Sequence, residues 1–151
     1  MVWLQEAYEI VRRANRYMIQ IWVATCLAQA HFVTQEEAKA HRHANEAVEV
    51  AEKFGFDGFR VAALRARGLV QSEGFKPTSS GLDDLRSALA LASRLKLRAE
   101  VAHCHAALGF ARVDDPAHHL DMAGNIYKSL GMSRWFEHLL DVSMSSELAW
   151  P

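Results

Sequence analysis

ALALASRLKL, residues 88–97, is the stretch that decides the fold, because its pattern of small and apolar residues occurs twice more along the chain. It aligns with residues 47–56 at an offset of 41, which also carries Gly68 onto Gly109, and with residues 123–132 at an offset of 35. A repeat of about this length is typical of stacked helix–turn–helix units, in which small residues let neighbouring helices approach. The alternative is that helices rich in Ala and Leu align by chance.

Outward from this stretch, apolar residues continue at helical spacing toward the N-terminus. Residues 1–54 contain neither Gly nor Pro, which predicts a hairpin of helices in residues 1–33 and a further helix that ends at Gly55. Thr34 and Glu37 form the pattern of a capping box at the start of that helix, and Asp57 can cap the next one.

The later helix boundaries also carry local signals. Residues 73–81, EGFKPTSSG, predict a loop because they concentrate Gly, Pro, Ser and Thr, and a helix follows Ser79 or Ser80. Asp115 before Pro116 predicts a helix start, and Gly131 predicts a helix end. We therefore expect an all-α protein of seven or eight helices.

The composition fits one helical domain. The 151 residues are about the length of a single domain. Lys and Arg number 17 against 18 Asp and Glu, so no charge excess favours nucleic acid or an anionic membrane as a partner. Cys26 and Cys104 are too isolated for a disulfide framework, and no signal peptide or membrane span is apparent. We expect a cytoplasmic protein.

Residues that could carry chemistry are present but do not group. The histidines at 41 and 43 and those at 103 and 105 stand two positions apart, so their side chains diverge on a helix, and His118–His119 fit a solvated first turn. Cys104 cannot pair with the adjacent His105 on a helix, and a glycine-rich phosphate loop is lacking. We expect no enzymatic activity, no metal site and no cofactor.

A resemblance becomes visible in residues 88–111, ALALASRLKLRAEVAHCHAALGFA, and 117–139, AHHLDMAGNIYKSLGMSRWFEHL. They resemble the tetratricopeptide (TPR) region at the C-terminal end of bacterial ATPase-linked adenylate cyclases and LuxR-like regulators. The resemblance covers roughly residues 40–140, and Lys96 stands where the family usually has Gly. The residues that match the family pattern are Ala88–Ala92, Leu95–Leu97, Ala102, His103, Leu108, Gly109, His119, Leu120, Ala123, Tyr127, Leu130, Gly131, Met132 and Trp135.

The resemblance implies a right-handed TPR-like superhelix of antiparallel hairpins in one domain, residues 1–151. Its divergent first hairpin would span residues 1–33, and its repeat hairpins 34–73, 80–113 and 115–149. The relatives' cyclase and ATPase domains are absent, so their activities do not transfer. The implied function is a non-enzymatic scaffold that binds a protein or peptide, or itself as a homodimer, in bacterial signalling. The alternatives are a regulatory fragment of a multidomain cyclase, ATPase or transcription regulator, and a homo-oligomerisation module.

The family's concave groove predicts the partner-binding residues by their distance from the two repeat glycines. Those around Gly68 are Ala62, Arg65, Leu69 and Ser72, and those around Gly109 are His103, Ala106, Phe110 and Val113. The alternative is that these residues pack against an added helix. Trp3 and Trp150 near the chain ends hint at self-association, because the ends of a repeat array need polar faces to stay soluble.

Overall fold

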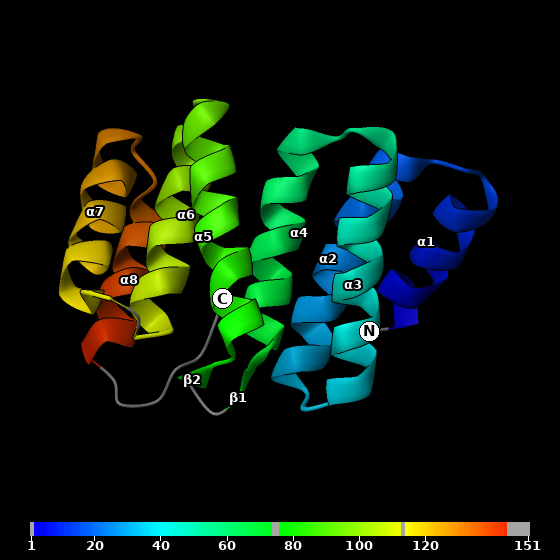
Figure 1. The fold of residues 1–151 in the computed structure, drawn as a ribbon, viewed down its shortest axis with the longest axis horizontal. Helices are drawn as coiled ribbons and strands as arrows, with labels where there is room; N and C mark the ends of the chain where they lie inside the picture. Colours follow the sequence, from blue (N-terminus) through cyan, green and yellow to red (C-terminus); the bar gives the residue numbers. More distant parts are fainter. Residues whose placement is uncertain (1, 74–75, 113, 145–151) are drawn as a thin grey trace.

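A computed structural model describes residues 2–73, 76–112 and 114–144, with 72–73, 76–77 and 142–144 described by their backbone. Over these residues the chain forms eight α-helices and one pair of two-residue strands, so the prediction of an all-helical protein is confirmed (Figure 1). The elements are α1 (Val2–Arg13), α2 (Tyr17–Val33), α3 (Glu37–Phe54), α4 (Asp57–Val70), β1 (Ser72–Glu73), β2 (Lys76–Pro77), α5 (Ser79–Arg94), α6 (Arg98–Phe110), α7 (Pro116–Ser129) and α8 (Ser133–Met144).

Left-handed residues end the odd-numbered helices. Gly55 and Gly131 follow α3 and α7 with φ of 68° and 67°, as the sequence predicts. Asn15 and Lys96 take the same conformation after α1 and α5, with φ of 52° and 57°. Lys96 thus makes the turn that glycine makes elsewhere, at the cost of crowding its Cβ. We call these four residues, which lie 40, 41 and 35 positions apart, the turn residues.

Two of the predicted helix caps are wrong. Thr34 does not open α3, because its hydroxyl donates to the Ala30 and His31 carbonyls at 3.1 and 3.3 Å and so closes α2. Asp57 is the first residue of α4 and caps nothing, although its carboxylate lies 3.4 Å from Arg60. A short polar side chain can serve either end of a helix, and local sequence does not decide which.

The described part of the segment predicted as a loop at 73–81 contains secondary structure. Ser72–Glu73 pairs antiparallel with Lys76–Pro77, and α5 begins at Ser79. The cap of α5 is Thr78, whose hydroxyl accepts from the Gly81 amide at 3.0 Å, and not Ser79 or Ser80. The predicted cap at Asp115 is confirmed, since its carboxylate accepts from the His118 amide at 3.2 Å ahead of Pro116.

The helices stand side by side along the long axis of the molecule, from α1 at one end to α7 and α8 at the other (Figure 1). The most extensive packing joins α2 to α3, α4 to α5 and α6 to α7, and the even-numbered helices also touch in series, α2 to α4 and α4 to α6. The predicted repeat hairpins 34–73 and 80–113 instead pair α3 with α4 and α5 with α6, which pack less extensively. The helix pairs that pack most closely are therefore shifted by one helix from the predicted hairpins.

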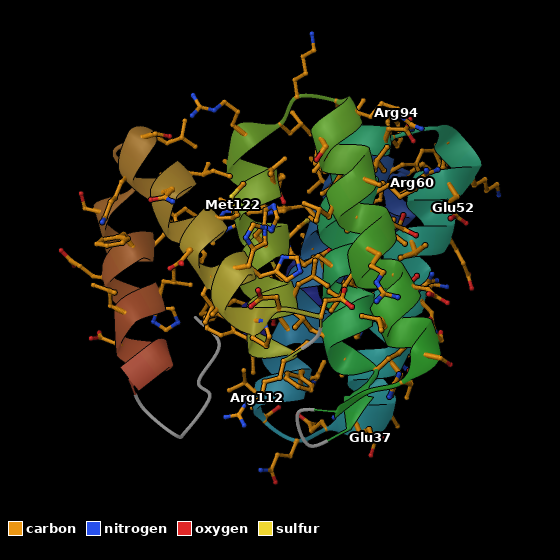
Figure 2. The ribbon with its side chains drawn as sticks, turned by 60° about the vertical axis from the view of Figure 1, so that its left-hand side comes forward. Glu37, Glu52, Arg60, Arg94, Arg112 and Met122 are labelled. Atoms are coloured by element: carbon orange, nitrogen blue, oxygen red, sulfur yellow. The ribbon has the colours of Figure 1, made fainter. Side chains whose placement is uncertain are left out.

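Arg60 and Arg94 lie at one end of the helices, and Glu37 and Arg112 lie at the other (Figure 2).

Small residues allow each close helix pair to form. A Cβ added to Gly109 in α6 would lie 2.6 Å from Leu120 Cδ2 in α7, and one added to Gly68 in α4 would lie 2.7 Å from the Gly81 carbonyl oxygen and 2.8 Å from Leu85 Cγ in α5. Both glycines stand 13 positions after a turn residue, and both leucines stand 11 before one. In the first pair these positions hold Ala28 and Ala44, which are buried together. The α4–α5 and α6–α7 pairs thus place a glycine against a leucine, whereas the α2–α3 pair has an alanine at both positions.

A second position, also counted from the turn residue, contributes a contact between polar side chains in each of the three close helix pairs. The residue 12 positions before the turn residue in α3, α5 and α7 reaches back to the preceding even helix. Asp84 accepts from Arg67 at 2.6 and 2.7 Å, the His119 and His105 Nδ1 atoms lie 2.8 Å apart, and the His43 ring stacks 5.6 Å from that of His31. Two of these contacts join histidines and the third is an ion pair, so the three contacts share a position but not a type of interaction.

Candidate functional site

Six of the eight residues predicted to line a groove lie on α4 and α6, and most of these are covered. Arg65, His103, Ala106 and Phe110 are buried, while Ala62 and Leu69 are half-buried. Ser72 is described by its backbone in β1, and Val113 lies outside the described residues.

Arg65 and Glu100 link neighbouring even helices. Arg65 Nη2 in α4 lies 3.3 Å from Glu100 Oε2 in α6, and the Arg65 side chain is 9% exposed against 29% for Glu100. Burying a guanidinium costs free energy unless it is paired, so the pair has a structural role. The carboxylate remains within reach of solvent and of a bound molecule.

His103 is held by aromatic residues from the last two helices. Its Nδ1 lies 2.7 Å from the Tyr127 hydroxyl in α7, and its ring meets that of Trp135 in α8 edge-on at 4.4 Å. Burial, with a smaller contribution from the Arg65 charge, lowers the pKa of His103 to about 4. The imidazole is therefore neutral at physiological pH and acts as a packed polar group.

The thiols are not activated. Burial raises the pKa of Cys104 to about 12 and also raises that of Cys26. Because the thiolate is the nucleophile, both cysteines are unreactive at neutral pH. Cys104 is buried, whereas Cys26 is half-buried.

The sequence prediction missed the histidine pair His105–His119. It placed His119 in a solvated turn, but the residue is half-buried and its Nδ1 contacts that of His105 at 2.8 Å. Burial, followed by the neighbouring imidazoles, lowers the pKa of His105 to about 4 and also lowers that of His119. One ring must donate and the other accept, which requires the accepting ring to be neutral. Within the described part of the chain, no three His, Cys, Asp or Glu side chains are grouped to hold a metal ion.

Four exposed apolar side chains of the even helices were also missed. Ile19, Phe59 and Trp135 all stand four positions after a turn residue and are 48%, 37% and 36% exposed. Trp22, 61% exposed, stands seven positions after Asn15 and so matches the predicted positions Ala62 and His103. Extending the repeat into the first hairpin would have found it.

These four residues form what we call the apolar row, consisting of Ile19, Trp22, Phe59 and Trp135. Ile19, Phe59 and Trp135 occupy equivalent positions on α2, α4 and α8, and the equivalent position on α6 is Glu100, the partner of Arg65. Trp22 lies one helical turn after Ile19 and so shares its face of α2. Exposed aromatic side chains are enriched at protein interfaces.

No helix among the described residues is long and apolar enough to cross a membrane. Comparison of the chain with family models, with curated proteins and with solved structures gives no match.

Proposed function

We propose that this protein is a TPR-like scaffold, a right-handed superhelix of helical hairpins, that binds a protein or peptide partner along its even helices. The observation that carries the proposal is the apolar row. Large apolar side chains cost free energy when they face water, and an aligned set of them marks an interaction surface more than single exposed residues do.

The partner that fits this row is a polypeptide segment with apolar side chains. Trp22, Phe59 and Trp135 offer rigid rings of the kind that dominate binding energy at protein interfaces. Glu100, partly exposed beside Arg65, can accept a hydrogen bond from the partner's backbone or from a basic side chain. The net charge of −1 gives no long-range preference for a strongly charged partner.

Selection of random displayed peptides on the purified protein tests the proposal. The expected result is enrichment of peptides with apolar side chains, whose dissociation constants Trp22→Ala raises on the order of 10-fold to 30-fold, as is typical of an aromatic hot spot. The matched control is Trp3→Ala, which removes an equally large exposed ring from α1, outside the row. The proposal fails if no peptide is enriched, or if both variants weaken binding equally.

A further inference from the structure

The first helix exposes a face that its counterparts bury. The repeat register identifies α1 as an odd-numbered helix, because Ala7 stands eight positions before a turn residue, as do Ala47, Ala88 and Ala123. Those three counterparts are fully buried, whereas Ala7 is only half-buried.

The same comparison holds at the larger side chains of α1. Trp3 is 83% exposed, although its counterparts His43 and Asp84 are buried against the preceding even helix. Ile10 is 66% exposed, while its counterpart Leu91 is buried and its counterparts Val50 and Ile126 are half-buried. The face of α1 that carries Trp3, Ala7 and Ile10, called here the α1 face, thus has the chemistry of a helix–helix contact without a helix against it among the described residues.

The other end of the stack does not match the α1 face. In α8, Glu137 and Asp141 stand six and ten positions after the turn residue Gly131 and are exposed. The residues at the same distances after Gly55 in α4 are Val61 and Arg65, which are buried. Docking α8 onto the α1 face of another copy would bury two carboxylates against Trp3 and Ile10, which is unfavourable without compensating partners. A head-to-tail contact between copies is therefore disfavoured.

The charges of α1 favour a second α1 instead. Glu6 is exposed between Trp3 and Ile10, and Arg12 and Arg13 are exposed in the last turn. Two copies of α1 that run antiparallel bring the acidic half of one helix to the basic half of the other. Their apolar residues then meet in between, and each Trp3 ring lies near an arginine of the second copy.

We propose that the protein forms a homodimer in which the α1 faces of two copies pack antiparallel around a twofold axis. Such a contact is self-complementary and closed, so it yields a dimer rather than a filament. It covers Trp3 and Ile10 and leaves the apolar row outside the contact. The proposal uses a different surface from the proposed peptide site and does not depend on that site.

Sedimentation equilibrium from low micromolar to near-millimolar concentration tests the dimer. The wild type is expected to show a discrete dimer, and Ile10→Glu is expected to weaken it on the order of 30-fold or more, as a buried central residue does. Trp22→Ala serves as the control, since it should leave the mass unchanged while weakening peptide binding. A monomeric wild type, or a dimer indifferent to Ile10→Glu, overturns the proposal.

A charge exchange tests the antiparallel arrangement. Glu6→Arg or Arg13→Glu alone places like charges across the contact and should weaken the dimer several-fold. The double variant Glu6→Arg/Arg13→Glu restores opposite charges and should recover most of the affinity, although both changes oppose the dipole of α1 itself. Far-UV circular dichroism verifies that α1 remains helical. Failure of a helical double variant to exceed the single variants refutes the antiparallel contact.

Discussion

Replacing Gly109 by Ala should show how much the stability of the α6–α7 contact depends on the absence of a side chain at this position. The added Cβ would lie 2.6 and 2.7 Å from two carbons of Leu120 and 3.3 Å from the Pro116 carbonyl oxygen. Overpacking of this kind costs about 1–3 kcal/mol, and the gain in helix propensity from Gly to Ala offsets up to about 1 kcal/mol of that. We expect Gly109→Ala to lower the free energy of unfolding by about 1–2 kcal/mol.

A second substitution, Leu120→Ala, removes the side chain that the added methyl group would contact. Leu120→Ala alone should cost about 2 kcal/mol for a half-buried leucine. In the double variant the new methyl group enters the space that the leucine vacates, as Ala28 and Ala44 already share the equivalent space in the first pair. The double variant should therefore lose no more than Leu120→Ala alone, which makes the two losses non-additive by about 1–2 kcal/mol.

The α4–α5 pair supplies the matched control. A Cβ on Gly68 would meet the Gly81 carbonyl oxygen at 2.7 Å as well as Leu85 Cγ at 2.8 Å. Leu85→Ala leaves that backbone oxygen in place, so it should not rescue Gly68→Ala. Urea unfolding followed by far-UV circular dichroism gives all the free energies. Losses at 109 and 120 that add within about 0.5 kcal/mol, or equal rescue at 68 and 85, would refute this account of the packing.

Three further predictions follow from the turns, the caps and the buried histidine. Lys96→Gly should raise the free energy of unfolding by about 1 kcal/mol, because glycine adopts a φ of 57° without a Cβ penalty; urea midpoints measure the gain. Asp115→Ala should lower it by about 1 kcal/mol through loss of the cap to His118, whereas Asp121→Ala, exposed within the same helix, should change it little in the same assay. His103 has a native pKa of about 4 against an ordinary value of 6.5, so the unfolded chain binds its proton first and stability falls as pH drops through this interval. Urea unfolding at both limits should show about 3 kcal/mol less pH dependence in His103→Gln than in the wild type; equal pH dependence would contradict the neutral buried imidazole.

Helix positions could be predicted from the sequence wherever a residue has one structural use. Gly55, Gly131 and Pro116 mark helix ends for reasons of backbone geometry alone, and all three predictions are confirmed. The prediction that Thr34 caps the start of a helix is wrong, because a threonine hydroxyl can either accept a hydrogen bond at a helix start or donate one at a helix end. Which option is realised depends on where the flanking helices pack, and that information is not local.

The pairing of helices and the site residues were harder to predict. The repeat predicts which helices are equivalent, but an odd helix contacts an even helix on both sides, so the sequence does not decide which contact is closer. Arg65 and His103 were assigned to a groove by register alone. They are buried because Glu100 and Tyr127 reach them from other helices.

The residues that break the repeat carry the functional argument. Positions that match across all hairpins, such as the buried alanines Ala47, Ala88 and Ala123, serve helix packing and would be needed in any stack of this kind. Trp22 stands where the next even helices have Ala62 and His103, and packing does not require its large exposed ring. Trp3 likewise stands where α3 and α5 bury a polar residue against a neighbouring helix. Because an exposed tryptophan costs solubility without adding to the core, each of these departures is best explained by a contact with another molecule. The two residues lie on different helices and different faces, so Trp22→Ala and Trp3→Ala should separate peptide binding from self-association.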